Sequence, residues 1–504
     1  MRYSSIRYEF EFETDVWTDV SAYVQGVDTG RMGFSGWGPL DRVASTGVFK
    51  FSLLNENHRF TPGHVNCTAG FQQGVNFRLV LAVGAGEYRT RFYGAVTGIT
   101  LDVYNNFLIT NVTVSDFIDQ MARHELDLPT YVQDKRIDEV APLIIANMPI
   151  APLNTDYNTG QDTFTNVFDT VKSRTTALSE FSKVALSELG LVYLKHGDGD
   201  DECLVVDGRY TRKDASLATV SGDDAVFETD LVNVRLTHSD YYYNYIKTIT
   251  YPREVDSTAT TVLFTLNQSV AITSGATVYI TGRFIDPNQE AVSVTGVDMV
   301  TPVATTDYLF NTASDGGGSN ITADLDVTAT YGTNGVEYEL TNNNASTGYV
   351  TFLQARGKGV YTYRPVEYVQ RNDTDITAYG KSILNLSMPY QDNPLVGEDF
   401  AGRLLDLYST RRTVVESISL ETSSTFLLKA FLELQVGDKI QIIVDEADID
   451  SMYFIHGINF TIDPSGFVQF TYSVIEAALM PAADYWELDS ATLSQLGETT
   501  VLGF

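Results

Sequence analysis

The sequence predicts a mainly β protein with a smaller helical part: two β-barrels that carry an inserted α+β domain and an inserted β-sandwich. Three observations predict this fold class. Apolar and polar residues alternate with a period of two near both ends of the chain. The period becomes helical after Ser115. Beyond Asp256 the composition shifts to Thr, Ser, Gly, Asn and Val with frequent turns, which is typical of short sandwich strands.

Residues 1–115 read almost entirely as strand and predict the first barrel. A glycine-rich loop at 30–39 interrupts the strands, and a polar turn follows at 55–63. The predicted strands are 5–12, 16–24, 48–53, 75–83, 88–93, 94–100 and 107–114.

Residues 116–206 predict the α+β domain. We expect helices at 116–126, 137–148 and 163–171, and a fourth helix capped by Thr175 or Thr176 and ended by Gly190. In the fourth helix Leu178, Phe181, Val184, Ala185 and Leu189 share one face. A hairpin of 191–194 and 203–206 follows directly, and its turn is the acidic stretch HGDGDDE.

The rest of the chain predicts four segments. Residues 207–255 are return strands that complete the barrel region, and 256–359 form the inserted sandwich. Residues 360–480 form the second barrel, which includes a helix at 394–412. Residues 481–504 are a C-terminal tail.

The strands of the second barrel are the clearest in the chain. Inward-facing apolar residues change parity at Gly457, which predicts a β-bulge there. Asp463-Pro464-Ser465-Gly466 has Pro at the second position and Gly at the fourth, which predicts a tight turn. The inward residues are Ile440, Ile442, Val444, Tyr453, Ile455, Ile458, Phe460, Ile462, Val468, Phe470, Tyr472 and Val474.

The net charge is strongly negative: 65 acidic and 33 basic residues give −32 at pH 7. Such a surface repels phosphate backbones, so sequence-specific nucleic-acid binding is not expected. A solubility or high-salt adaptation and a specific use of the charge both remain open. The sequence shows no apolar run long enough for a membrane helix and no signal-peptide core, so we expect folding in the cytosol.

No complete metal or cofactor site is predicted. His58, His64 and Cys67 offer three ligands, which is an incomplete set for zinc. The acidic run 198–202 lacks the length and spacing of a calcium loop and is interpreted as a hairpin turn. Cys67 and Cys203 are too few for a disulfide framework, although a single bridge between them stays open.

No catalytic residues are predicted either, and we expect the protein not to be an enzyme. His124-Glu125 lacks the second histidine of the zinc-protease pattern, and no nucleophile elbow or phosphate-binding loop occurs. Carboxylate pairs are too abundant here to indicate a glycosidase. Tyr241, Tyr243 and Tyr245 would share one face of a strand, where they could stack on sugars but more commonly pack at an interface.

The order of several loose motifs resembles that of the tail hub proteins of tailed phages. The motifs are FKFSLLNENHRFTPG, RFYGAVTGI, LSELGLVYLKHGDGDDECLVV, LVNVRLTHSDYYYNYIKTI, DITAYGKSIL, LQVGDKIQI and MYFIHGINFTIDPSGFVQFTYSV. The end, WELDSATLSQLGETTVLGF, also resembles the ends of such proteins. The resemblance covers nearly the whole chain and rests on the order of the motifs, since none is chemically diagnostic.

The resemblance implies a structural virion protein at the phage tail tip, assembled in the host cytoplasm. Two tube-like barrels per subunit would form a homotrimeric ring. This ring would adapt the hexameric tail tube or distal tail ring to a central fibre or tip protein, and DNA would pass through its channel. Residues 256–359 would decorate the outside and contact the host or a neighbour. Since the sequence ends soon after the second barrel, no appended peptidase, lysozyme or fibre domain is expected.

The resemblance also gives the negative charge a use, because a carboxylate-lined channel repels DNA phosphates over a Debye length of about 8–10 Å. Asp438, Glu446, Asp448 and Asp450 lie in the second barrel, although each is more typical of a solvated turn. Two other functions stay open: a carbohydrate- or receptor-binding module of a phage tail, and a polysaccharide hydrolase. The host, the tail morphology and the neighbouring proteins are not determined by the sequence.

Overall fold

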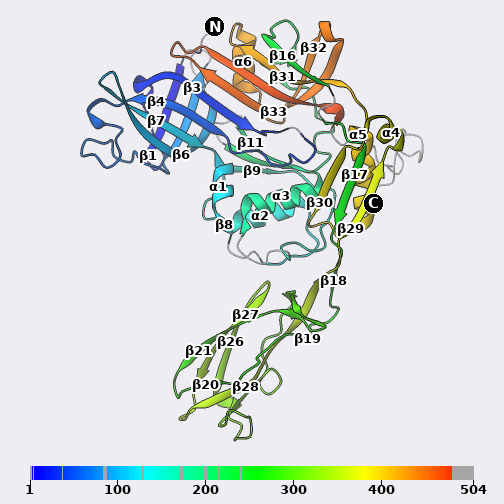
Figure 1. Ribbon diagram of the computed structural model, residues 1–504. Helices are drawn as coiled ribbons and strands as arrows, with labels where there is room; N and C mark the ends of the chain where they lie inside the picture. Colours follow the sequence, from blue (N-terminus) through cyan, green and yellow to red (C-terminus); the bar gives the residue numbers. More distant parts are fainter. Residues whose placement is uncertain are drawn as a thin grey trace.

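The computed structural model describes residues 3, 5–36, 38–82, 88–126, 130–169, 175–196, 202–213, 215–238 and 241–479, and every statement below concerns these residues. The predicted tail 481–504 and the acidic turn 198–201 lie outside them. The fold is mainly β, as predicted. A large sheet lies above the helices α1, α2 and α3, and a β-rich unit extends away from this body on a two-stranded stalk (Figure 1).

One sheet of 13 strands dominates the body. Its strands are β1 (Ser5–Glu13), β2 (Val16–Asp19), β3 (Val24–Gly33), β4 (Val48–Leu54), β5 (Asn76–Ala82), β6 (Tyr88–Tyr104), β7 (Phe107–Ser115), β15 (Val226–Phe227), β16 (Asn233–His238), β31 (Thr413–Glu421), β32 (Lys439–Val444), β33 (Ile449–Ile462) and β34 (Val468–Glu476). Their order is β16-β31-β34-β33-β3-β4-β7-β6-β5-β1-β2, with β32 beside β33 and β15 beside β32. We call this the main sheet.

The main sheet joins the two ends of the chain. Strand β3 pairs antiparallel with β33, from Asp28 opposite Ile462 to Gly33 opposite Gly457. In the described residues, no strand pairing closes either half on itself. The two units that the alternation pattern predicted are therefore halves of one continuous sheet, and a single core of buried apolar side chains lies under both.

Helix α6 (Thr425–Glu433) contacts both halves of the main sheet. Its apolar face is buried, and Phe431 packs against the Phe460 ring of β33 with a centroid distance of 5.1 Å. The Tyr3 hydroxyl from the first half donates to the Leu428 carbonyl at 2.7 Å. From the second half, the Tyr472 hydroxyl donates to the Ala430 carbonyl at 2.9 Å.

The local predictions for the second half are confirmed. The register of β33 against β34 shifts between Ile455 and Gly457, so the bulge lies where the apolar parity changes. Gly457 is required there because a Cβ would come within 2.9 Å of the Phe34 carbonyl oxygen. The predicted turn after β33 forms: the Gly466 N–H donates to the Asp463 carbonyl at 2.9 Å, with Gly466 at φ +78°.

The α+β region lies beneath the main sheet and has its own core. It contains α1 (Phe117–Arg123), α2 (Ile137–Ala146), α3 (Ala177–Glu188), β9 (Asn154–Tyr157), β11 (Leu191–His196), β12 (Glu202–Asp207) and the short pair β8 (Glu125–Leu126) and β10 (Thr175–Thr176). Thr176 caps α3 as predicted, accepting the Ser179 N–H at 3.2 Å. Hairpin β11–β12 also forms as predicted.

The helix predicted at 163–171 is wrong. Phe164 and Val167 instead bridge antiparallel to Lys135 and Val132, and Phe168 takes a left-handed backbone with φ +67°. Phe164, Val167 and Phe168 are all buried, so an irregular buried segment reproduced the helical spacing of apolar residues.

A second, three-stranded sheet lies beside α3, with order β29-β17-β30. Its elements are β17 (Tyr245–Thr250), β29 (Val366–Arg371), β30 (Ile383–Met388), α4 (Asp373–Tyr379) and α5 (Pro394–Tyr408). Parts of the segments predicted as return strands (207–255) and as the second barrel (360–480) therefore form a separate layer, covered by α5. Alternation predicts a strand but cannot tell which sheet it joins.

Residues between β18 (Arg253–Val255) and the end of β28 (Gly348–Thr362) form the extended unit, with a core of its own. Its other strands are β19 (Thr261–Thr265), β20 (Val270–Ile272), β21 (Thr277–Arg283), β22 (Ile285–Asp286), β23 (Gln289–Ser293), β24 (Thr295–Val297), β25 (Tyr308–Asn311), β26 (Leu325–Gly332) and β27 (Gly335–Asn342). One layer gathers around β28, and the other is β21-β27-β26. We call this unit the sandwich. A short pair, β13 (Thr219–Val220) and β14 (Asp223–Asp224), completes the strands of the described residues.

Candidate functional site

The main sheet presents a continuous polar face across the β3–β33 pairing that connects its two halves. A groove of about 660 Å³ lies on it. Its polar lining residues come from five adjacent strands: Thr29, Arg31, Lys50, Asn459, Thr461, Gln469, Thr471, Ser419 and Glu421. We call this set the polar face. These residues alternate with core residues such as Phe460 and Phe470, because successive strand residues point to opposite sides.

The polar face is stabilised by close packing and cross-strand hydrogen bonds. A Cβ on Gly30 would come within 2.1 Å of the Phe460 ring, so only glycine lets β3 approach β33 this closely. Ser419 and Thr471 hydroxyls lie 3.0 Å apart, and the Gln469 amide donates to Glu421 at 2.9 Å. The face therefore offers hydroxyls and amides on a rigid support.

The charges on the polar face are nearly balanced. Arg31 and Lys50 carry positive charge and Glu421 carries negative charge. The four acidic candidates lie elsewhere: Asp438 caps a turn by accepting the Gln435 N–H at 2.8 Å, and Asp450 accepts from Gln441 at 2.6 Å. Glu446 and Asp448 form the short turn between β32 and β33. All four thus lie in turns or at a strand start, which agrees with the interpretation of these residues as turn residues rather than as a channel lining.

A second groove, of about 610 Å³, continues the polar surface toward β6. Gln25, Ser52, Asp102 and Asn111 line it. Asn111 connects Ser52 with Asp102, since it accepts from the Ser52 hydroxyl at 2.7 Å and donates to Asp102 at 2.6 Å. The polar surface therefore extends over both halves of the main sheet.

The histidine and cysteine candidates do not form a metal site in the described residues, where no three His, Cys, Asp or Glu side chains are grouped to hold an ion. The His58 and His64 rings stack with centroids 4.2 Å apart. Cys67 and Cys203 are both free thiols, which answers the question of a bridge between them. No helix in the described part of the chain has the length and apolar character needed to cross a bilayer.

The tyrosine run is a packing element, but not in the predicted form. Tyr241 and Tyr243 precede β17 in irregular backbone and do not share a strand face with Tyr245. Tyr243 packs edge-on against Tyr408 of α5 at 6.3 Å, and the hydroxyl of Tyr242 donates to Asp375 at 3.0 Å. The tyrosine run therefore packs the three-stranded layer against α4 and α5, and its rings are not arranged as a sugar-stacking surface.

Two buried carboxyl groups meet where the first half of the main sheet contacts the α+β region. Asp116 caps α1 and accepts N–H groups from Gly47 at 2.8 Å and Ile118 at 3.1 Å. Burial raises the pKa of Asp116 to about 8, although these N–H groups act in the opposite direction. Burial, and then the nearby Asp116 charge, raise the pKa of Glu202 well above its usual value. Glu202 Oε2 has no hydrogen-bond partner.

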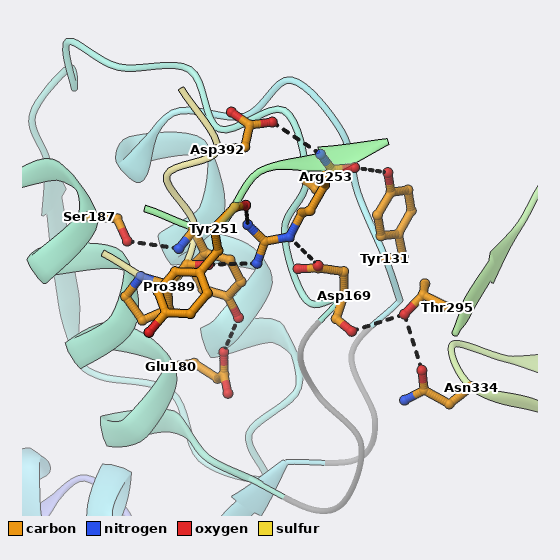
Figure 2. A network of polar contacts seen from close by, with 12 residues as sticks. Tyr131, Asp169, Glu180, Ser187, Tyr251, Arg253, Thr295, Asn334, Pro389 and Asp392 are labelled. Atoms are coloured by element: carbon orange, nitrogen blue, oxygen red, sulfur yellow. Dashed lines mark hydrogen bonds and ion pairs between the residues drawn. The ribbon is translucent and has the colours of Figure 1, made fainter. Parts of the chain in front are cut away.

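A buried ion pair fixes the sandwich to the body (Figure 2). Arg253, at the start of the stalk, is bonded to the Asp169 carboxylate and donates to the carbonyls of Tyr251 at 2.8 Å and Pro389 at 2.6 Å. The side chains of Arg253 and Asp169 are almost fully buried. From the sandwich, the Thr295 hydroxyl donates to the Asp169 carbonyl at 2.9 Å. Three parts of the molecule therefore meet at Asp169.

Sequence reasoning missed both the polar face and the Arg253–Asp169 junction. The polar face combines residues up to 442 positions apart, from Thr29 to Thr471, and only the pairing of β3 with β33 brings them together. Ordinary threonines and asparagines on alternate strand positions carry no motif. The junction had a weak signal, since Arg253 follows a proline at the boundary where the composition changes.

Comparison with known proteins finds relatives in structure only. No protein-family model and no curated protein matches the chain. The tail protein from Neisseria meningitidis MC58 matches with a TM-score of 0.49 and 9% identity, over 95% of this chain and 98% of that chain. The 43 kDa tail protein of prophage MuSo2 from Shewanella oneidensis matches with a TM-score of 0.49 and 10% identity, over 94% and 99% of the two chains.

A third match is the E. coli c3393 protein, described as a component of the type VI secretion system with structural similarity to T4 bacteriophage tail proteins gp27 and gp5. It has a TM-score of 0.40 and 8% identity, over 96% of this chain and 86% of that chain. These matches are tail and tail-like proteins, the class that the motif order resembles. At TM-scores below 0.5 they do not assign a function.

The carboxyl pair predicts a distinctive pH dependence of stability. An unfolded Asp or Glu releases its proton near pH 4, whereas folded Asp116 keeps its proton to about pH 8. The unfolded state therefore binds fewer protons across this interval, and the unfolding free energy falls as pH rises from about 4 to 8. Glu202→Gln removes one of the two charges, so it should raise the unfolding free energy at pH 9 by at least about 1 kcal/mol.

Urea unfolding at pH 5 and pH 9 measures this effect. At pH 5 the variant and the natural protein should differ little, because Glu202 is then protonated. Exposed Glu337→Gln serves as the control and should leave the pH slope unchanged. An identical slope for Glu202→Gln and the natural protein would show that the buried pair does not titrate in this range.

The junction predicts that Arg253→Met loosens the sandwich. Removing one partner of a buried ion pair costs about 3–5 kcal/mol, because the other charge stays buried. Limited proteolysis should cut the stalk faster in this variant, and Arg253→Met with Asp169→Asn should recover part of the loss. Lys358→Met is the control, since its ion pair with the exposed Asp298 contributes little. Equal cleavage rates for Arg253→Met and the control would contradict the role of the junction.

Proposed function

We propose that this chain is a structural virion protein that forms a trimeric hub at a phage tail tip. The observation that carries the proposal is the main sheet, in which two β-rich halves from opposite ends of the chain share one sheet, one core and one polar face. Three copies would supply six such halves, which is the number needed to match a hexameric tail tube or distal tail ring.

The proposed ring would have its polar face toward the channel. Heterologous contacts repeated around an axis close into a ring. Three strands of the main sheet, β16, β2 and the short β15, pair on one side only among the described strands. Each subunit therefore has unlike ends of one sheet for its neighbours, as a closed ring of identical chains requires.

The proposed channel would let DNA pass without binding it. Tight phosphate binding needs many arginine and lysine contacts, and the central groove offers only Arg31 and Lys50, together with the acidic Glu421. Hydroxyl and amide groups keep the wall hydrated. The proposed wall is therefore polar and nearly neutral rather than lined with carboxylates, and the net charge of −32 acts over the rest of the surface.

We propose a structural rather than a catalytic role, with the tail tube or distal tail protein on one side and a central fibre or tip protein on the other. The proposed location is the tail tip of the virion, after assembly in the host cytoplasm. The exposed surface of the sandwich is the proposed site of host contact.

A second candidate function, carbohydrate or receptor binding, belongs to the sandwich itself. On the outer face of β21-β27-β26, Tyr279 is 61% exposed and lies opposite Glu339, which lies opposite Thr328. An exposed ring can stack on a sugar while a carboxylate and a hydroxyl bond its hydroxyl groups. A groove of about 580 Å³ at one end of this face is lined by Thr281, Glu337 and other residues.

The mass of the purified protein tests the hub. Light scattering after size exclusion should give three times the mass of one chain, and electron microscopy of that species should show a ring with a central channel. A chain that stays monomeric at high concentration, or a trimer whose images show no channel, would contradict the proposal.

Replacing residues 256–359 tests the second candidate. Val255 and Val360 are antiparallel partners, so an Asn-Gly turn can join them directly. The shortened protein should form the same oligomer and lose binding to a bacterial-polysaccharide array. Tyr279→Ala should weaken binding about tenfold, whereas Tyr363→Ala, an exposed tyrosine off this face, should not. Unchanged binding by the shortened protein would exclude the sandwich as the binding module.

A further inference from the structure

The end of the β6–β7 hairpin projects beyond the main sheet. Strand β5 pairs with β6 only as far as Ala95, and β4 pairs with β7 only from Ile109 onward. Residues 100–107 therefore form a two-stranded ribbon whose strands pair with each other, and the next residue, Leu108, bonds outside it, since its carbonyl accepts the Asn55 N–H at 2.8 Å. Asn105 and Asn106 close it with φ of 49° and 64°, the left-handed pair that a two-residue hairpin turn requires.

This ribbon, residues 100–107, carries apolar side chains into solvent. Val103 is 75% exposed, Tyr104 67% and Phe107 62%, and Tyr104 lies directly opposite Phe107. An isolated two-stranded ribbon is at best marginally stable in water, and contiguous exposed apolar residues mark interaction sites. The outer backbone edge of the ribbon also lacks a strand partner among the described residues, which makes it a template for strand addition.

Strand β16, which ends the strand order in the other half of the main sheet, has an exposed backbone edge. It pairs only with β31 in the described strands. Val232, just before this strand, and Leu236 within it are exposed. Arg235 lies between them with 68% of its side chain exposed and forms an ion pair with Glu416 of the same copy at 2.7 Å. This edge therefore combines apolar residues with an exposed ion pair whose arginine keeps most of its surface accessible.

Charge selects the partner of the ribbon. The chain carries −32, so most contacts between two copies bring like charges together. The segment 100–111 contains Asp102 as its one charged residue, and 232–238 contains Arg235 as its one formally charged residue. The single charges of the two segments are of opposite sign. Arg235 is 68% exposed and Glu416 only 21%, so a carboxylate from another copy can approach the arginine on its open side. A second copy of this chain is therefore the occupant that the surface fits.

We propose that the ribbon of one copy adds to the β16 edge of a second copy, with Asp102 facing Arg235 of that copy. The ribbon and β16 belong to opposite halves of the main sheet, so the contact is heterologous and leaves an unused ribbon and an unused edge for the next copies. Three repeats close a ring. The inference rests on the proposed ring and specifies the contact that builds it.

Cysteine cross-linking tests the contact. The background protein has Cys67→Ser and Cys203→Ser, and the test protein adds Val103→Cys and Leu236→Cys. Mild oxidation should give dimers and trimers on non-reducing gels, because each chain supplies one cysteine to each neighbour. Val103→Cys alone and Leu236→Cys alone should give no such ladder. Cross-links as abundant in either single variant would overturn the heterologous contact.

Charge substitutions give a second readout that does not depend on cross-linking. Val103→Glu should raise the dissociation constant of the oligomer by at least about tenfold, a loss of 1.4 kcal/mol, and Val103→Glu with Leu236→Lys should restore assembly. Exposed Tyr279→Glu on the sandwich is the matched control and should leave assembly unchanged. Circular dichroism of each variant checks that the fold is kept.

The outcomes separate this inference from the hub proposal. If the natural protein is a trimer and Val103→Glu remains a trimer of the same affinity, the ribbon contact is wrong and the hub proposal stands. If the natural protein is monomeric, both are wrong, and a different protein covers the ribbon. Loss of trimer assembly in Val103→Glu, with assembly restored when Leu236→Lys is added, supports the contact.

Discussion

The pairing of β3 with β33 is the constraint on which the rest of the structure depends. It joins two segments more than 400 residues apart in the sequence, and it needs Gly30 to lie against the Phe460 ring and Gly33 beside the Gly457 bulge. Once this pair forms, one core and one polar face span both halves. The α+β region, the three-stranded layer and the sandwich are all insertions between those two strands, so each must fold without disturbing the pair.

Much of the local structure could be predicted because its causes are local. The bulge at Gly457, the turn at Asp463–Gly466 and the Thr176 cap each follow from a few neighbouring residues. Segment 163–171 failed because a buried irregular segment can space Phe164, Val167 and Phe168 like a helix. The assignment of β17 to a separate sheet, and the joining of the two halves, depend on contacts between distant segments that periodicity does not encode. The polar face was missed for the same reason.

Burial, rather than net charge, sets the electrostatics of the interior. The chain has nearly twice as many acidic as basic residues. Where the parts of the molecule meet, however, the local charge depends on individual buried groups. Asp169 is neutralised by Arg253, whereas Asp116 and Glu202 share a site with no ion pair to either carboxylate in the described residues. The Arg253–Asp169 ion pair holds the sandwich against the body. The stability of the contact at Asp116 and Glu202 depends instead on pH.

The stalk of the sandwich has an evolutionary consequence. The chain leaves the body and returns to it on paired strands, with Val255 opposite Val360, so the intervening residues are joined covalently to the body at one place. Recombination at that point can exchange one outer unit for another without altering a residue of the main sheet. The surface of the sandwich can therefore diverge while the main sheet stays under separate selection.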